Sequence, residues 1–404
     1  MSGIAPASTS YRLSFIDVLR GIAVLLMIET HVVNAMMQEV FKDGFIFKAF
    51  NLLSGFASVG FIFCAGAGFW LAIERKGEDY RAFKTPLWQY LRRLAFIFAM
   101  AYLIHLPVFS LEKTLQLEPD MMRRFLECNV LQLIVTASLL VLFFFFIIPR
   151  LNVLKYVYLI LALLIFCLTP FIWSLDPFKT FPFAVALFFT KQGMSAFPLF
   201  PWSGYLFAGA AFTAFFLKAE DRTQFAKRAA IISFAGIFVC LYVIRLLPWS
   251  LPGYNDWWFS SPGHALFRTS GTIFFFSILY IFQEKIASFK AGQFLQSAGQ
   301  ESLFIYIFHL MLVYGSVLNF GLNAFLKDQL TPLTTIIVIA AITWASYAMA
   351  IMWKNYKQQD ISRARRLMLA LATVFFLGYA LVPAKQFTAI NDAFKEKVPQ
   401  LKLF

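Results

Sequence analysis

The chain has 404 residues, of which 60% are hydrophobic and only 14% are charged, and 51 are phenylalanine. Soluble domains are on average about 45–50% apolar, so this composition excludes an ordinary soluble protein and predicts an integral membrane protein in a lipid bilayer. The formal net charge of +14 indicates no nucleic-acid partner, because the basic residues gather in loops between apolar segments, as membrane topology requires.

Eleven apolar stretches along the chain are suited to crossing about 30 Å of hydrocarbon as helices. Only helices and closed barrels satisfy every backbone group in lipid, and these stretches are too long and too uniformly apolar for barrel strands. The sequence therefore predicts an all-α, polytopic transmembrane helical bundle of about 10–11 spans. The predicted spans are 15–37, 50–73, 93–109, 129–148, 153–172, 198–217, 229–247, 267–283, 302–320, 333–353 and 367–383.

We expect one transmembrane domain over 15–383, between a short N-terminal segment, 1–14, and a C-terminal tail, 384–404. Alternate loops, beginning with 74–93, are richer in Lys and Arg than the loops between them. By the positive-inside rule these basic loops and the N-terminus are cytoplasmic, and eleven spans place the C-terminus outside. The four lysines from Lys385 onward fit this poorly, so either one span is miscounted or the tail is an amphipathic surface helix.

The first predicted span contains an arginine and a histidine eleven residues apart, Arg20 and His31. Eleven helical steps cover about 16 Å and return almost to the same face, which also carries Asp17. Ionisable groups inside a span are costly and normally face a bundle interior or a cavity, so this face predicts a polar site. The alternative is that Asp17 and Arg20 only pair with each other. Glu29 points some 160° away from His31 and is expected to face another helix.

Several segments of the chain resemble one family of membrane enzymes. They are RLSFIDVLRGIAVLLMI with His31, FCAGAGFWLA, FPLFPWSGYLFAGA at 197–210 and ESLFIYIFHL at 301–310. In this order they resemble the transmembrane acyltransferase (acyltransferase-3) superfamily, and in particular bacterial relatives of heparan-α-glucosaminide N-acetyltransferase. The resemblance implies transfer of an acetyl or short acyl group from cytoplasmic acyl-CoA to a sugar or glycan acceptor across a bacterial inner membrane.

The resemblance also implies roles for the residues of the first span. His31 becomes the catalytic base or a transient acyl carrier, since an imidazole titrates near neutral pH. Arg20, with Asp17, shapes the CoA entrance, because a guanidinium binds phosphate with paired donors. Arg92 and Arg93 are further candidates for CoA binding, although the positive-inside rule places such residues there in any case.

Three other groups of residues are candidates for a site. His309 lies within the ninth predicted span and is either a second catalytic group or a structural hydrogen-bonding residue. Asp256, Trp257 and Trp258 lie in an outer loop that either binds the acceptor, through stacking on sugars and a carboxylate, or belongs to an interfacial aromatic belt. We expect His105 near the outer interface and His264 in an ordinary loop. The dispersed histidines form no metal-ligand set, so no metal is predicted.

A proton-coupled transporter or lipid flippase, with His and Glu relaying protons, is the alternative function, and a scaffold without activity is a third. No inverted repeat is visible in the sequence, and such repeats are common in transporters. The arginine and histidine of the first span therefore favour the enzyme. The sequence leaves the oligomeric state open.

Overall fold

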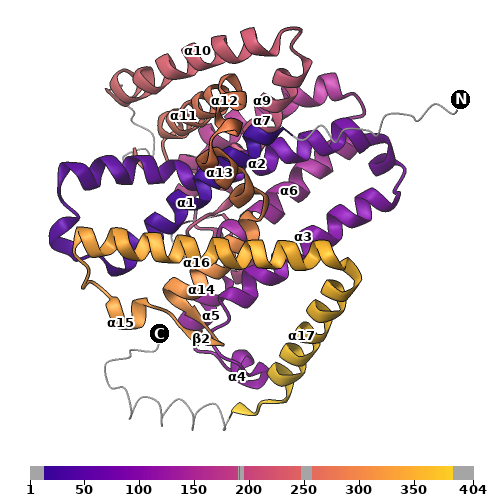
Figure 1. Ribbon diagram of the computed structural model, residues 1–404. Coiled ribbons are helices and arrows are strands. Elements are labelled where there is room, and N and C mark those ends of the chain that lie inside the picture. The colour runs from indigo at the N-terminus through magenta and orange to yellow at the C-terminus, as the bar shows by residue number, and fades with distance from the viewer. Residues whose placement is uncertain (1–12, 190, 192–194, 247–256, 385–404) are drawn as a thin grey trace, which may run out of the picture.

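The computed structural model describes residues 13–189, 191, 195–246 and 257–384, and this part of the chain is a bundle of helices (Figure 1). Within these residues lie seventeen α-helices and a single two-stranded ladder, in which β1 pairs antiparallel with β2. The predicted all-α class is therefore confirmed. The N-terminal segment up to residue 12 and the tail from residue 385 lie outside the described residues.

The long helices are α1 (Ser14–Met36), α2 (Phe45–Arg81), α3 (Thr85–Ile104), α6 (Val130–Ile147), α7 (Leu151–Ser174), α9 (Leu199–Lys218), α10 (Arg222–Tyr242), α11 (Pro262–Ile281), α13 (Lys290–Gln300), α14 (Ser302–Tyr314), α16 (Pro332–Gln359) and α17 (Ile361–Leu381). The short elements are α4 (Leu111–Leu115), α5 (Pro119–Leu126), α8 (Phe183–Ala186), α12 (Gln283–Ser288), α15 (Asn323–Leu326), β1 (Gly315–Ser316), β2 (Asn319–Phe320) and the 3-10 turns Glu39–Phe41, Pro177–Lys179 and Ile244–Leu246.

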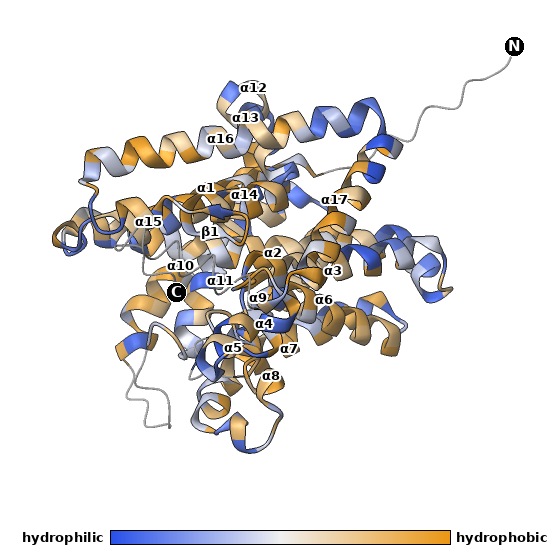
Figure 2. Cartoon of the chain, turned by 90° about the horizontal axis from the view of Figure 1, so that it is seen from below, coloured by the Kyte–Doolittle hydropathy of each residue, from blue (hydrophilic) through white to orange (hydrophobic). Residues whose placement is uncertain are grey.

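Each of the eleven predicted spans overlaps one of these long helices, but the predicted bounds differ: 302–320 includes β1 and β2 after α14, and 93–109 runs past the end of α3. By length and composition, eight of the described helices can cross a membrane: α2, α6, α7, α9, α10, α11, α16 and α17. The other three predicted spans are α1 and α3, which carry charged residues, and α14, which has only 13 residues. Figure 2 shows the long helices as mostly hydrophobic, with hydrophilic residues toward their ends and connections. The chain is an integral membrane protein.

Helix α1 lies inside the bundle and is covered on several sides. It packs against α2, α11, α13, α14 and α16 (Figure 1). Its side chains Val24, Ile28, Val32 and Met36 are fully buried, and Phe15 is 1% exposed. A helix that is apolar around most of its circumference belongs in the core of a bundle. The charged residues of α1 consequently have protein beside them, where partners can be supplied.

Glycines allow α2 and α9 to approach each other at backbone distance. A Cβ atom built at Gly66 would overlap the carbonyl oxygen of Leu206, and one built at Gly209 would overlap that of Phe63. Small residues at such crossings let helix backbones come close, which is how membrane helices gain packing energy. A Cβ at Gly68, two residues along α2, would meet nothing within 4 Å.

We expect Gly66→Ala to destabilise the protein by about 1–3 kcal/mol, because the added methyl group forces α2 and α9 apart. The measurement is thermal unfolding of the purified protein in detergent. Gly68→Ala is the matched control, since its methyl group has open space and should leave the melting temperature nearly unchanged. Equal melting temperatures for the two variants would contradict the packing.

Candidate functional site

The two histidines predicted within spans lie side by side in the bundle. His31 of α1 and His309 of α14 have ring centroids 5.4 Å apart. His309 is fully buried, and the ring of Tyr306, one turn earlier on α14, lies edge-on to it at 5.5 Å. The structure therefore joins the first predicted motif to the late one, although 277 residues separate them in the sequence.

The hydrogen bond of His309 fixes which of its nitrogens carries the proton. Its Nδ1 lies 2.9 Å from the carbonyl oxygen of Ile305, and a carbonyl only accepts, so Nδ1 donates. The lone pair of the neutral ring is then on Nε2, which is buried and has no partner within the described part of the chain. A buried acceptor without a donor is unfavourable and typical of functional sites.

His31 is held by a residue that the sequence analysis did not single out. Its Nδ1 lies 3.0 Å from the hydroxyl oxygen of Tyr314, the last residue of α14. If Nδ1 donates to this oxygen, Nε2 keeps a lone pair and can accept a proton from a substrate. The hydrogen bond spans 283 residues, so no local spacing rule could have revealed it.

The chain leaves α14 immediately after Tyr314 in a conformation that favours glycine. Gly315 has a φ of 86°, and a side chain there would strain the backbone. Asn319, in the turn formed by β1 and β2, donates from Nδ2 to the carbonyl oxygen of Met311 at 2.8 Å. This turn fixes the end of α14 and therefore the position of the Tyr314 hydroxyl.

At the other end of the same face of α1, Arg20 contacts α13. Its Nη1 lies 3.3 Å from Oδ1 of Asp17 and 3.5 Å from the carbonyl oxygen of Gly299. The pairing considered as the alternative for Asp17 and Arg20 therefore exists. The Arg20 side chain nevertheless stays 23% exposed, and the remaining N–H groups of a guanidinium can bind another anion.

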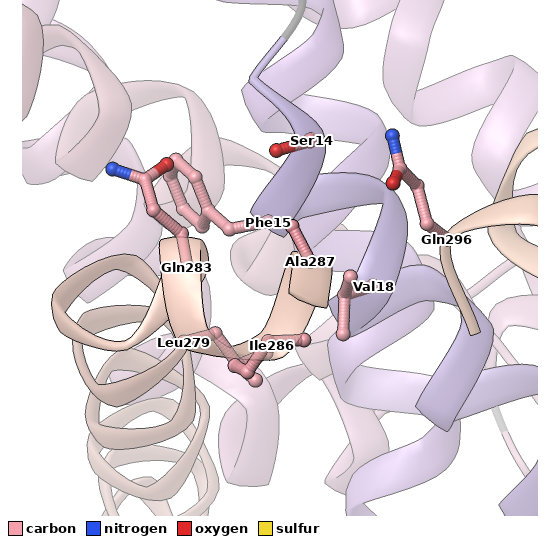
Figure 3. Close-up of a pocket in the computed structure, with 8 residues that line it drawn as sticks. All are labelled: Ser14, Phe15, Val18, Leu279, Gln283, Ile286, Ala287 and Gln296. Atoms are coloured by element: carbon pink, nitrogen blue, oxygen red, sulfur yellow. The ribbon is translucent and has the colours of Figure 1, made fainter. Parts of the chain in front are cut away.

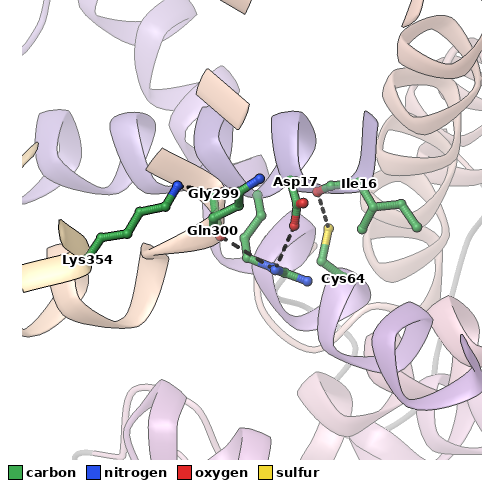
Figure 4. A network of polar contacts seen from close by, with 7 residues as sticks. Ile16, Asp17, Cys64, Gly299, Gln300 and Lys354 are labelled. Atoms are coloured by element: carbon green, nitrogen blue, oxygen red, sulfur yellow. Dashed lines mark hydrogen bonds and ion pairs between the residues drawn. The ribbon is translucent and has the colours of Figure 1, made fainter. Parts of the chain in front are cut away.

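Gly299 brings this part of α13 against α1. A Cβ atom there would overlap the carbonyl oxygen of Asp17, and one at Gly21 would overlap that of Leu295. Figure 4 shows Asp17, Gly299, Gln300 and Lys354 gathered around this contact, where Lys354 donates to Oε1 of Gln300 at 3.0 Å.

An open groove lies beside this network. It has a volume of about 660 Å³ and is lined by Gln300, Glu301, Lys354, Lys357 and residues 358, 359 and 361. Lys357 forms an ion pair with Glu301 at 2.9 Å. The groove falls within the usual size of ligand sites, and the sequence analysis counted these lysines only as part of a basic loop. A smaller cavity of about 10 Å³, between the start of α1 and α11 to α13 (Figure 3), has room for about one water molecule.

The other predicted site residues lie elsewhere. Arg92 and Arg93 are exposed on α3, and Arg92 donates to the carbonyl oxygen of Trp88 in its own helix. Trp257 and Trp258 lie near His264, with centroid distances of 6.4 and 5.4 Å. Asp256 lies outside the described residues.

The remaining two histidines, His264 and His105, lie at the ends of helices α11 and α3. The expectation that His264 is an ordinary loop residue is wrong: it lies in the first turn of α11 and is only 8% exposed. The prolines and glycine around it suggested a loop, but Pro262 is at the first position of the helix, where proline is favoured. His105 is the residue that caps the C-terminal end of α3, where its backbone N–H donates to the carbonyl oxygen of Tyr102 at 3.1 Å.

Glu29 lies on the far side of α1 from His31, as its helical position predicts. Its carboxylate accepts a short hydrogen bond from the hydroxyl of Ser54 on α2 and another from Thr30. Glu29 and His31 therefore contact different helices, α2 and α14, and do not form a direct relay.

These features define an integral membrane protein in which a partly buried histidine meets a fully buried one inside the helix bundle, with a groove containing cationic side chains at one end. The catalytic family of heparan-alpha-glucosaminide N-acetyltransferase matches residues 12–247, more than half of the chain. The protein belongs to this family, which confirms the resemblance predicted from the sequence. A comparison with curated proteins gives no match.

The matched region contains Arg20 and His31 but ends before α11. His309 and Tyr314, which the structure places beside His31, lie beyond it, as does Gly299 beside Arg20. The part of the chain after residue 247 thus completes both ends of the polar face of α1.

Proposed function

We propose that the protein transfers an acetyl or short acyl group from acyl-CoA to an amine or hydroxyl of a sugar or glycan acceptor, with His31 as the general base. The observation that carries the proposal is the meeting of His31, His309 and Tyr314 in the core of a protein from an acetyltransferase family. No metal is required, because the imidazole supplies the proton acceptor.

In this proposal, acyl-CoA enters the helix bundle at the end where α1 begins. Arg20 and the groove with Lys354 and Lys357 offer cationic groups for the phosphates of CoA. Arg20 and His31 are about 16 Å apart along α1, a separation that suits the slender pantetheine arm. The positive-inside rule favours a cytoplasmic position for this end, and in this proposal the acceptor binds on the opposite side of the membrane.

The reaction needs one base at the reacting carbonyl. The acceptor nitrogen or oxygen attacks the thioester carbon while its proton passes to Nε2 of His31. The new C–N or C–O bond forms, the C–S bond breaks, and the proton passes from His31 to the departing CoA sulfur. Tyr314 positions the imidazole by accepting from Nδ1, and His309, with a free lone pair beside it, assists as a second polar group.

The rival function, a proton-coupled transporter, requires a chain of titratable groups across the bundle. Glu29 and His31 face different helices, which gives such a relay no direct step on α1. The enzyme therefore remains the better supported function.

We expect His31→Ala to lower acyl transfer by at least about a hundredfold, because the general base is lost. Purified protein in detergent is mixed with radiolabelled acetyl-CoA and a panel of amino sugars, and label transfer and CoA release are measured. Binding of CoA should change no more than severalfold, since Arg20 is intact. A variant that retains most of its turnover would refute the role of His31.

Tyr314→Phe should lower transfer by about fivefold, the effect of losing one hydrogen bond of roughly 1 kcal/mol that orients the base. The ring stays in place, so the melting temperature should remain close to that of the wild type. Tyr347→Phe, on α16, is a control for the loss of a tyrosine hydroxyl elsewhere in the bundle. Transfer at the wild-type rate in Tyr314→Phe would show that this hydroxyl does not position His31.

Arg20→Ala should weaken acyl-CoA binding much more than it slows transfer at saturating donor. Arg20→Lys should restore binding only in part, because a lysine lacks paired donors. Binding is measured by isothermal titration with CoA, and Arg150→Ala, at the exposed start of α7, is the matched control. Equal CoA affinity in the wild type and Arg20→Ala would remove Arg20 from the donor site.

A further inference from the structure

A second polar cluster lies on α11, beside the segment of α2 that meets Glu29. Its centre is Arg268, whose Nε donates to Nε2 of His264 at 3.0 Å. Nη1 of Arg268 lies 3.5 Å from the carbonyl oxygen of Leu52, and the guanidinium lies over the ring of Phe56, 5.0 Å from its centroid. An arginine within a membrane span is rare and indicates a function.

The bundle makes room for this guanidinium by means of a glycine. A Cβ atom built at Gly55 of α2 would overlap both Nη1 and Nη2 of Arg268. The neighbouring Ser54 donates a hydrogen bond to Glu29 of α1. Consecutive residues of α2 therefore contact α1 and Arg268. Arg268 is part-buried rather than enclosed, as a ligand-binding side chain must be.

The positive charge of Arg268 has no counter-charge among the described residues. No carboxylate of this part of the chain forms an ion pair with it within 4.0 Å. His264 accepts through Nε2, so its ring is neutral, and the other partner is a backbone carbonyl. Removing one partner of a buried ion pair typically destabilises a protein by about 3–5 kcal/mol, so an unpaired cation here indicates a missing anion.

Trp257, beside His264, provides another hydrogen-bond donor. Nε1 of Trp257 is buried and has no partner in the described part of the chain, and the Trp257 ring lies 6.4 Å from that of His264. Guanidinium and indole N–H groups are donors only. A ligand that satisfies this cluster must therefore bring acceptor oxygens and a negative charge.

We propose that Arg268 binds a carboxylate or phosphate group that enters from the side where α11 begins. An acidic acceptor and a lipid headgroup are the two sources of such a group, and both present the same oxygens to the guanidinium. Binding itself does not require acyl transfer. Only the assignment of the anion to the acceptor rests on the proposed function.

The test measures binding in the absence of acetyl-CoA. Purified protein in nanodiscs of neutral phosphatidylcholine is titrated with sodium glucuronate or with glucose, and its thermal unfolding is followed. Glucuronate should raise the melting temperature of the wild type in a saturable manner, and glucose should not. Parallel nanodiscs that contain phosphatidylglycerol test the lipid phosphate. A response to glucuronate identifies a soluble carboxylate as the ligand, and a response to phosphatidylglycerol alone identifies the lipid.

Three variants test whether the stabilisation by the anion depends on Arg268. Arg268→Gln should weaken the apparent affinity at least tenfold. Gly55→Ala should do the same with the arginine present, because its methyl group occupies the position of the guanidinium. Arg245→Gln is the matched control, since Arg245 is exposed near Trp258 and should keep the wild-type response.

Two results would overturn the proposal. One is a wild-type protein that responds to neither anion, or equally to glucuronate and glucose. The other is a wild type without an anion response together with an Asp256→Asn variant that loses as much stability as Arg268→Gln. That combination would identify Asp256 as the partner of Arg268. Failure of acyl transfer would leave the binding result unchanged, so the two proposals fail separately.

Discussion

The structure depends on one constraint, which is that charged groups in a membrane span must have protein partners. An arginine or aspartate at the centre of a span costs about 2.5–3.5 kcal/mol on insertion scales. Helix α1 contains Asp17, Arg20, Glu29 and His31, and six other described helices contact it. Arg20, Glu29 and His31 each have a partner on another helix, on α13, α2 and α14 respectively, and Asp17 pairs with Arg20 of α1 itself. The need for these partners constrains the arrangement of the helices.

Glycine contacts and polar contacts act together in this arrangement. At the start of α1, Gly21 and Gly299 let α13 approach so closely that a backbone carbonyl reaches Arg20. A larger residue at either glycine would move the carbonyl away and leave the guanidinium with Asp17 alone. The same principle recurs at Gly55, where the absent side chain provides the space for Arg268. Close packing is therefore a condition for both polar sites.

The sequence predicted the class, the position of the helices and the polar face of α1, because hydropathy and helical periodicity are local properties. It also gave both histidines of the buried pair, although their contact depends on how α14 packs against α1. Tyr314 was missed because an aromatic residue at the end of an apolar helix has no local signal. Lys354 and Arg268 were missed for a related reason: membrane topology already explains the first, and the partners of the second lie on α2.

The polar groups of α1 divide into two environments that have different chemical uses. On one side, His309 is fully buried, its Nδ1 donates to the carbonyl oxygen of Ile305, and its Nε2 has no partner in the described part of the chain. On the other side, Glu29 is bound to Ser54, and the neighbouring turn of α2 cradles a cation. In the proposed transfer, this separation keeps an anionic ligand bound at Arg268 away from the thioester that reacts beside His31. A charge at the reacting carbonyl would interact more strongly in this low-dielectric interior than in water. Helix α1, which separates the two environments, is therefore the element on which both the proposed chemistry and the proposed binding depend.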